Sequence, residues 1–506
     1  MTDTDFGIID VNAQIGPRHG QAAGAPFEDL QRERRAHGVR YSLTRHRNAI
    51  WAEASSGNEE MIEAAQGDPG IVPVGALSID RTDRYLQRPA AFASRVAAFW
   101  IEGIFEGRGA PIDSVPAENL LREVARTGKP LFIVLRSAGD ASRIGRATAD
   151  LGIPVILVGH HYDFSVENLA AAKRYEHLHL ETSRMAHLDA VSVAVSELGA
   201  ERVLYGTGAP IRAMQSALNA ILQAPISDDA KRLILGGNAQ RLFGLPAEPV
   251  RLPQVALPPR SIDVHTHFGP FPWDVTDMRD EDLMPLLRER NNSQGAVESC
   301  VLAIASDLDA GNQHTVDLCR DLSAGGQVGY LVADPTDPER AREHFRKWGD
   351  SPGIVGAKVH CQWSHRLTGH PQIAALFEVL AEFGKPVKIH NDGDDWHERL
   401  LELARRHPKL PIVIAHGGLG YPMLEGAELT VKADNVYFEM CSSFAQPLST
   451  VREIVRTVPR HKFLFGTDAP LLDPGFVLGT YQDSEIPDDQ QDDVYYGNAV
   501  RLYGLN

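Results

Sequence analysis

The chain contains an internal repeat that spans almost its whole length. RVLYGTGAP at 202–210 returns as KFLFGTDAP at 462–470, with Gly208 in the place of Asp468. Four other pairs of segments match in the same order, at an offset of roughly 255–260 residues. Because the order is kept, the two halves are expected to share one fold. These pairs are FGIIDVNAQIGP (6–17) with RSIDVHTHFGP (260–270), GKPLFIVLRSAGD (128–140) with GKPVKIHNDGDD (384–395), IPVILVGH (153–160) with LPIVIAHG (410–417), and GGNAQRLFGLP (236–246) with YGNAVRLYGLN (496–506).

The repeat predicts two domains, 1–247 and 261–506, joined by a proline-rich linker at 248–260. Each domain is close to the ~250 residues of a typical (β/α)8 barrel. In the second domain, short apolar runs rich in β-branched residues alternate with longer amphipathic stretches, as in βα units around a parallel sheet. The fold class predicted is therefore α/β, with two tandem (β/α)8 TIM-type barrels, in preference to an open doubly wound sheet. The eight strands expected in the second domain are 262–267, 299–305, 328–333, 354–360, 386–390, 411–416, 435–439 and 463–467.

Composition narrows the class of partner. The formal net charge of −17 argues against nucleic acid, whose phosphates require a surplus of Lys and Arg. No apolar stretch approaches the length of a membrane span, and the N-terminus lacks the features of a signal peptide. The four cysteines are widely spaced and favour reduced thiols. These features predict a cytoplasmic protein that acts on a small molecule.

Polar side chains follow the expected strands of the second domain at their carboxyl ends. His265 and His267 end the first strand and, being two apart, face the same side. His390 ends the fifth strand, His416 the sixth, and Asp468 follows the eighth. In a barrel these ends meet at one mouth, where active sites of this fold lie. Imidazoles with a carboxylate suit Zn²⁺, with Mn²⁺ and Fe²⁺ as alternatives.

The motifs DVHTH, KIH, IAHGG and GTDAP of this domain resemble those of the amidohydrolase superfamily, specifically amidohydrolase family 2. The resemblance implies that His265, His267, His390 and Asp468 are metal ligands. It implies that His416 holds a second metal or the polarised oxygen of the substrate. Asp468 would accept a proton from metal-bound water and pass it to the leaving group. Asp263 precedes the first histidine on the opposite face and is expected to be structural.

The fourth strand ends in GAKVHC, which places Lys358 and His360 on one face. Both are predicted to contact substrate, Lys358 as the partner of a substrate carboxylate. The resemblance offers an alternative, a carboxylated Lys358 that bridges two metal ions. Cys361 and Cys441 fall near the mouth without an evident base, and packing is the expected role.

The first domain lacks every one of these ligand types at the matching positions. Asn12 and Gln14 replace the paired histidines, Val134 replaces His390, and two glycines, Gly159 and Gly208, replace His416 and Asp468. The apolar strand residues and closing motif persist. The first domain is therefore predicted to be a degenerate copy, a pseudo-enzyme that pairs with the second barrel within the chain or covers its mouth. Without a metal, a carboxylate facing the mouth would be an uncompensated charge.

Three functions are compatible with the sequence. The leading hypothesis is a metal-dependent hydrolase of an amide, lactone or related carbonyl compound. The alternative is a metal-dependent lyase, a non-oxidative decarboxylase or hydratase of a small carboxylic acid, with Lys358 or Arg366 as the anion partner. Some such decarboxylases carry Glu two residues before the paired histidines, where this chain has Asp263. A non-catalytic scaffold with two inactive barrels is the third. Homo-oligomerisation is compatible with each of them.

Overall fold

The computed structural model describes residues 6–17, 24–51, 54–77, 89–102, 111–269, 278–322, 325–360, 367–390, 396–417 and 423–505. The chain divides into two compact units, Met1–Val255 and Ala256–Asn506. The first unit contains the strands of the first predicted domain, and the second unit contains those of the second. We describe each unit by itself.

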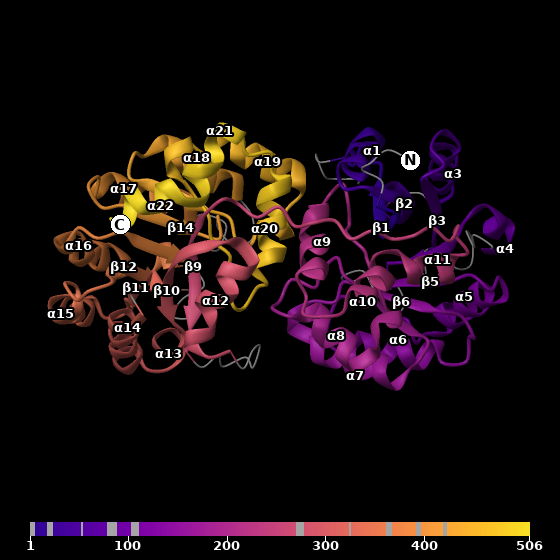
Figure 1. The fold of residues 1–506 in the computed structure, drawn as a ribbon, viewed down its shortest axis with the longest axis horizontal. Helices are drawn as coiled ribbons and strands as arrows, with labels where there is room; N and C mark the ends of the chain where they lie inside the picture. Colours follow the sequence, from indigo (N-terminus) through magenta and orange to yellow (C-terminus); the bar gives the residue numbers. More distant parts are fainter. Residues whose placement is uncertain are drawn as a thin grey trace. The chain divides into compact units, whose positions relative to one another are not determined.

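The N-terminal unit is a (β/α)8 barrel whose eight strands are parallel and ordered as they occur in the sequence. Helices surround the strands, as Figure 1 shows. The strands are β1 (Ile8–Ile15), β2 (Val39–His46), β3 (Ile71–Leu77), β4 (Ala98–Ile101), β5 (Leu131–Val134), β6 (Val155–Val158), β7 (Leu178–Glu181) and β8 (Val203–Leu204). The helices are α1 (Phe27–Ala36), α2 (Arg47–Trp51), α3 (Ala54–Gly67), α4 (Pro89–Phe92), α5 (Val115–Arg126), α6 (Asp140–Thr148), α7 (Ser165–Arg174), α8 (Ala190–Leu198), α9 (Met214–Leu222), α10 (Asp228–Arg232) and α11 (Asn238–Phe243).

The C-terminal unit repeats this plan, again with eight parallel strands in sequence order. The two tandem (β/α)8 barrels expected from the repeat are thus confirmed. The strands are β9 (Ser261–Phe268), β10 (Ser293–Cys300), β11 (Gln327–Val332), β12 (Ile354–Val359), β13 (Val387–His390), β14 (Ile412–Ala415), β15 (Val436–Glu439) and β16 (Phe463–Leu464). The helices are α12 (Asp280–Asn291), α13 (Val301–Ala305), α14 (Leu308–Leu322), α15 (Pro338–Trp348), α16 (Ile373–Phe383), α17 (Trp396–Arg406), α18 (Met423–Lys432), α19 (Leu448–Thr457), α20 (Pro474–Asp483), α21 (Asp488–Asp492) and α22 (Asn498–Tyr503).

One predicted strand is wrong. The apolar run that suggested a strand at 299–305 mostly forms helix α13, whose Ala303 and Ile304 pack with Phe268 in a buried cluster. The strand that pairs with β9 is the more polar β10, at Ser293–Cys300. Its small and polar side chains are buried on both faces of the barrel wall. Apolar content therefore misplaced this strand, because burial here is imposed by neighbouring strands rather than by hydrophobicity.

Backbone hydrogen bonds join the first strand of each barrel to the segment after its last strand. In the N-terminal barrel, Val11 N donates to Tyr205 O at 2.9 Å and Gly208 N to Asn12 O at 2.6 Å. In the C-terminal barrel, Val264 N donates to Phe465 O at 2.9 Å and Asp468 N to His265 O at 2.7 Å. These bonds bring the residues after the eighth strand against the first strand, at the mouth of each barrel.

Helices cover the outer face of each sheet through apolar stripes. In α15, Asp337 caps the first turn by accepting from Arg340 N, and Pro338 occupies the first helical position. Ala341, Phe345 and Trp348, spaced four and three residues apart, are buried. Helix α17 follows the same pattern, with Trp396, Leu400, Leu403 and Ala404 buried.

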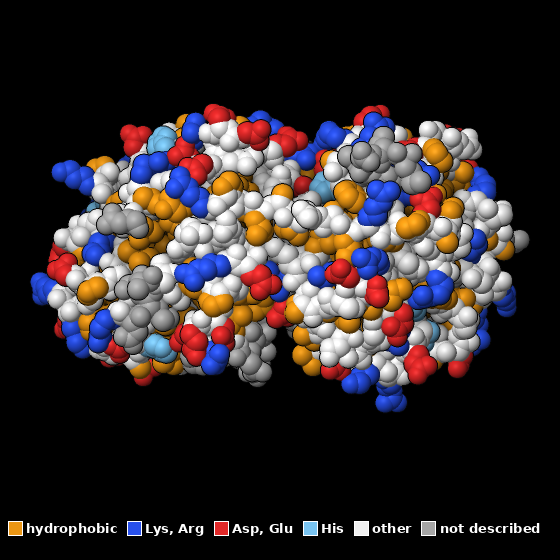
Figure 2. Space-filling model, viewed as in Figure 1, with side chains coloured by type: hydrophobic (Ala, Val, Ile, Leu, Met, Phe, Trp, Pro, Cys, Tyr) orange, Lys and Arg blue, Asp and Glu red, His pale blue; other side chains and the backbone are white. Residues whose placement is uncertain are grey.

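The surface carries charges of both signs. On the face drawn in Figure 2, Lys and Arg side chains are interspersed with Asp and Glu. Among the described residues, no helix combines the length and the hydropathy required to span a bilayer.

Candidate metal centre

His416 and Asp468 adopt a backbone conformation that most residues avoid. They follow β14 and β16 and have φ of 61° and 66°, in the left-handed region. Their counterparts in the N-terminal barrel, Gly159 and Gly208, have φ of 93° and 80°. A non-glycine residue in this region costs on the order of 1–3 kcal/mol, and such residues cluster at functional sites. The fold keeps this backbone in both barrels, and only the second places side chains with possible metal-ligand atoms on it.

His265, His267 and Asp468 converge at the mouth of the C-terminal barrel. Asp468 Oδ1 lies 3.1 Å from His267 Nε2 and 3.5 Å from His265 Nε2. The three side chains are 1–7% exposed, and their ligand atoms lie within 4.8 Å of one another. The structure therefore brings these three predicted ligands together in a group of the size and chemistry that a divalent ion requires.

The other ring nitrogen of each paired histidine is held by a polar partner. His265 Nδ1 lies 2.6 Å from Glu439 Oε1, and His267 Nδ1 lies 2.9 Å from Ser299 Oγ. A carboxylate at Nδ1 fixes the tautomer that leaves Nε2 as the electron-pair donor. Both Nε2 atoms face Asp468, so the donor set fits a divalent ion.

His416 lies on the other side of Asp468. Its Nδ1 is 3.9 Å from Asp468 Oδ2 and 3.0 Å from Ser442 Oγ. Cys441 Sγ is 3.0 Å from the same nitrogen. Burial and the charges of Glu439 and Asp468 raise the pKa of the Cys441 thiol well above its usual value. The Cys441 sulfur and one ring nitrogen each of His265 and His416 form a second group of possible ligand atoms, all within 4.8 Å of one another.

His390 lies next to His416, and His360 lies next to His390. The ring centroid of His390 is 4.6 Å from that of His416 and 4.8 Å from that of His360. His390 is buried, yet it does not belong to the groups of described residues whose ligand atoms converge within 4.8 Å. The structure thus places His390 at the mouth, beside His416 rather than within the His265 group.

Two lysines are fully buried beneath the histidines. Lys358 Nζ lies 3.2 Å from His265 Nε2, and Lys388 Nζ donates to Val264 O at 2.7 Å and lies 3.4 Å from Glu439 Oε1. Burial and the neighbouring Lys388 charge lower the pKa of Lys358 to about 8. A lysine near neutrality is able to accept CO₂ as a carbamate or to pair with an anion. The structure leaves both predicted roles of Lys358 open.

Burial sets the protonation of the histidines. Desolvation, followed by the charges of Lys358 and Lys388, lowers the pKa of His265 well below its usual value. Desolvation also lowers the pKa of His416 and of His360, with neighbouring histidines adding to the effect. Neutral imidazole is the form that binds a metal ion. His265, His416 and His360 are therefore in the form needed for ligation near neutral pH.

Asp263 holds the barrel together instead of facing the site. Its carboxylate accepts from Thr467 Oγ1 at 2.5 Å, from Thr467 N at 3.0 Å and from His265 N at 3.1 Å. It is fully buried, and burial raises its pKa to about 7. These bonds fix the GTD turn against β9, which agrees with a structural role.

The chain matches the model of a known protein family. A family model described as Amidohydrolase matches residues 146–245 and 262–505, more than half of the chain. The chain belongs to the amidohydrolase family. In this amidohydrolase the match covers nearly all of the C-terminal barrel but begins only in α6 of the N-terminal barrel. The half without the ligand set is thus also the half that departs further from the family.

Solved structures resemble one barrel of this amidohydrolase at a time. They include 2,6-dihydroxybenzoate decarboxylase from Rhizobium (16% identity, 49% of this chain and 99% of that chain, TM-score 0.40). A putative 2-pyrone-4,6-dicarboxylic acid hydrolase from Pseudomonas putida has 17% identity over 48% of this chain and 99% of its own (TM-score 0.39). A manganese-containing dihydroxybenzoic acid decarboxylase from a Polaromonas species has 17% identity over 49% and 97% (TM-score 0.38). At these identities the likeness concerns the fold. No curated protein matches the chain.

The sequence prediction missed several residues that shape the site of this amidohydrolase. Glu439 contacts His265 and also accepts from His416 N and Cys441 N, both at 2.8 Å. It ends the predicted strand 435–439, so its position at a strand end was the available signal. Lys388 lies in the KIH motif but received no role, and Ser299 lay in no motif. Cys361 and Arg366 lie outside the described residues.

Proposed function

We propose that the C-terminal barrel is a metal-dependent hydrolase that opens an amide, lactone or related carbonyl group with an activated water. One observation carries the proposal: Asp468 presents one oxygen to His265 and His267 and the other to His416. A carboxylate with this double contact is positioned to bind a cation and to move a proton at the same mouth.

The fit of the donor set supports a divalent ion held by His265, His267 and Asp468, with His390 as a further ligand. Zn²⁺ is the ion we propose first, since two imidazoles and a carboxylate are among its usual ligands. Mn²⁺ and Fe²⁺ accept the same donors. When bound, the ion lowers the pKa of a coordinated water and polarises the carbonyl of the substrate.

The protein groups then have separate tasks. Asp468 Oδ2 takes the proton of the attacking water and returns it to the leaving group. His416, neutral and 3.9 Å from that oxygen, donates to the developing negative oxygen of the substrate. Glu439 orients His265, and His360 contacts the substrate from the end of β12. Lys358 supplies a positive charge next to the reacting group.

The alternative is a lyase acting on a small carboxylic acid. The pair of buried lysines favours it, because Lys358 Nζ lies within 3.2 Å of His265 and would attract a substrate carboxylate to the same place. Lys388 contributes less, since Glu439 compensates its charge at 3.4 Å. The hydrolase remains our first proposal because proton transfer through Asp468 serves water attack directly.

Metal content tests both proposals together. The full chain, produced without added metal and without chelators, is expected to hold about one ion in the C-terminal barrel, and His265→Ala is expected to remove it. Two ions lost together in His265→Ala would indicate a binuclear centre with carboxylated Lys358. A chain that binds no divalent ion after reconstitution would contradict hydrolase and lyase alike.

A substrate screen then separates the two reactions. Lactones and amides with and without a carboxylate are incubated with the loaded enzyme, and released acid and released CO₂ are measured in the same samples. Acid without CO₂ supports the hydrolase. CO₂ or water elimination from a carboxylic acid, with no lactone or amide opened, would replace it by the lyase.

A further inference from the structure

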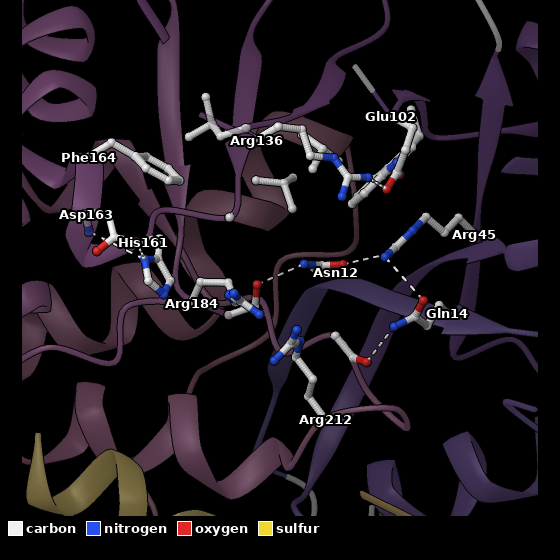
Figure 3. A pocket seen from close by; sticks show the side chains of 17 residues that line it. Asn12, Gln14, Arg45, Glu102, Arg136, His161, Asp163, Phe164, Arg184 and Arg212 are labelled. Carbon is white, nitrogen blue, oxygen red and sulfur yellow. Dashed lines mark hydrogen bonds and ion pairs between the residues drawn. The ribbon is translucent and has the colours of Figure 1, made fainter. Parts of the chain in front are cut away.

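The mouth of the N-terminal barrel contains a cavity, although this barrel lacks the metal ligands. Its volume is about 380 Å³, within the range of small-molecule sites. Figure 3 shows the polar side chains that line it, contributed by β1, β2 and by segments that follow other strands. The described lining residues are Asn12, Gln14, Arg45, Trp100, Glu102, Val134, Leu135, Arg136, Val158, Gly159, His161, Asp163, Phe164, Ser183, Arg184, Gly208 and Arg212.

In the N-terminal barrel the guanidinium of Arg45 lies beside Asn12 and Gln14, the two residues that replace the paired histidines. Arg45 Nη1 donates to Asn12 Oδ1 at 2.6 Å, and Nη2 donates to Gln14 Oε1 at 3.4 Å. Arg45 pairs with Gln14 in the strand ladder as Ser299 pairs with His267 in the other barrel. The arginine thus stands where a serine supports a metal-site histidine. A fixed positive charge therefore occupies the region that an ion occupies in the proposed centre.

A second serine position is also an arginine. Arg184 comes three residues after Glu181, as Ser442 comes three residues after Glu439. Ser442 contacts His416 in the C-terminal barrel. The Arg184 side chain forms no hydrogen bond or ion pair with the residues that the structure describes, and burial lowers its pKa. Arg184 is partly exposed, and the charge of Glu181 opposes the effect of burial on its pKa. Its guanidinium therefore presents a positive charge and hydrogen-bond donors at the cavity wall, where an anion is able to pair with it.

Arg212 brings a further positive charge to the same place. Arg184 and Arg212 both act on His161, whose pKa is lowered first by burial and then by these charges. Figure 3 shows both side chains reaching toward the space between His161 and Asn12. The two guanidinium groups therefore face one region of the cavity.

Charge and shape together define the ligand. Four arginines line the cavity against two carboxylates, Glu102 and Asp163, in a chain whose net charge is −17. Glu102 is already bound by Arg136 and by Trp100 Nε1, and Asp163 lies 3.0 Å from His161. Part of the wall is apolar, formed by Val134, Leu135, Val158 and Phe164. An inorganic anion would leave that wall unused.

We propose that the N-terminal barrel binds a small organic carboxylate without a metal ion, with Arg184 and Arg212 pairing with the carboxylate and the apolar wall covering its body. A planar guanidinium matches a carboxylate through two parallel hydrogen bonds. The degenerate barrel is then a binding module for an organic acid.

The test uses the full chain after metal removal by a chelator and dialysis. Benzoate, phthalate and succinate are the probes, benzamide is the neutral control, and inorganic phosphate and sulfate are the inorganic controls. Binding is measured by titration calorimetry for wild type, Arg184→Gln, Arg212→Gln and the control Arg122→Gln, an exposed arginine of α5 paired with Glu118. His265→Ala shows whether the C-terminal barrel contributes.

We expect at least one probe carboxylate to bind the metal-free chain, with benzamide silent. Arg184→Gln and Arg212→Gln should each weaken that binding about tenfold or more, the loss of a charge-assisted hydrogen bond. Arg122→Gln and His265→Ala should leave it unchanged. Circular dichroism is used to check that each variant is folded. If Arg184→Gln does not fold, the comparison of Arg212→Gln with wild type tests the proposal.

Three outcomes would overturn the proposal. The first is no binding of any probe carboxylate. The second is phosphate or sulfate binding as tightly as the carboxylates, which would make the site one for inorganic anions. The third is binding that disappears in His265→Ala and persists in both arginine variants, which would place the ligand in the C-terminal barrel.

Discussion

The two barrels keep the same internal frame while differing in the residues that face the mouth. In the N-terminal barrel Thr207 Oγ1 donates to Asp10 at 2.6 Å, and in the C-terminal barrel Thr467 Oγ1 donates to Asp263 at 2.5 Å. Asn238 and Asn498 donate to equivalent carbonyls, those of Val203 and Phe463, in the last strand of each barrel. These bonds are needed to close the barrel, so they remain when chemistry is lost.

Gly208 and Asp468 occupy equivalent backbone positions in the two barrels. The backbone there is left-handed in both barrels, and glycine adopts it without the steric cost that Asp468 pays. A side chain in that conformation is retained where it has a task. In a barrel without the metal-ligand types, glycine at this position avoids both the strain and an uncompensated carboxylate. The same reasoning applies to Gly159 and His416.

The barrel interiors differ in the same sense. Strand pairing places Trp100 beside Phe132 in the N-terminal barrel and Lys358 beside Lys388 in the C-terminal barrel. The aromatic pair stacks with ring centroids 5.4 Å apart, whereas the lysines require Glu439 and a carbonyl as partners. At this pair of positions the N-terminal barrel has two aromatic rings and the C-terminal barrel has two ammonium groups. Buried charges occur in both barrels, since Asp10 and Glu181 are fully buried in the first.

Making the second barrel like the first is expected to have the largest effect. Asp468→Gly removes the proposed base and ligand, so turnover should fall by about 10³-fold or more, and metal content should fall with it. Relief of the left-handed strain should raise the stability of the metal-free protein by about 1 kcal/mol. Kinetics, metal analysis and chemical unfolding of the metal-free chain measure these changes.

The matched control is Glu485→Gly, another left-handed residue, with φ of 63°. It should give a similar gain in stability with unchanged turnover. Full activity in Asp468→Gly would remove Asp468 from the mechanism.

The equivalent glutamates of the two barrels offer a smaller effect with an internal control. Glu439→Gln weakens the support of His265 Nδ1, and loss of such a partner typically costs 10–100-fold in metal affinity or activity. Glu181 instead accepts from Gly159 N and from Ser183, so Glu181→Gln should leave turnover unchanged. Metal affinity and steady-state rates are compared for both variants. Equal losses would indicate a general structural role for this carboxylate.

The smallest effect concerns acid stability of the N-terminal barrel. Burial lowers the pKa of His160 to about 3, so the unfolded chain, with a usual pKa near 6.5, binds this proton first as pH falls. Stability is therefore lost on acidification from about pH 6.5 downward, by at most about 2 kcal/mol at pH 5. His160→Asn should flatten this dependence in urea unfolding measured at several pH values.

Asp10 titrates in the same window with the opposite sign. Burial raises its pKa to about 6, so its contribution to stability decreases as pH rises toward that value. Asp10 is present both in the wild type and in His160→Asn. The difference between their pH dependences of stability therefore reports on His160 alone. An unchanged pH dependence would show that His160 is not responsible.

Much of the fold was accessible from the sequence because the repeat supplied two readings of each element. Apolar runs located seven of the expected strands in the second domain, but β10 at Ser293–Cys300 is polar and was displaced onto the helix that follows. The histidines were found since they end strands. Arg45 and Arg184 were not, because which long side chain reaches a cavity depends on packing rather than on local pattern.

The arginines at the two serine positions also affect whether the first barrel could hold a metal ion if its ligand residues were restored. Suppose that His returned at positions 12 and 14 and Asp at 208. The guanidinium groups of Arg45 and Arg184 would still repel a divalent ion from the restored ligands. A metal site in this barrel would therefore require both arginines to be replaced, while Arg136 and Arg212 would still line the cavity. Restoring the ligand residues alone would not be sufficient.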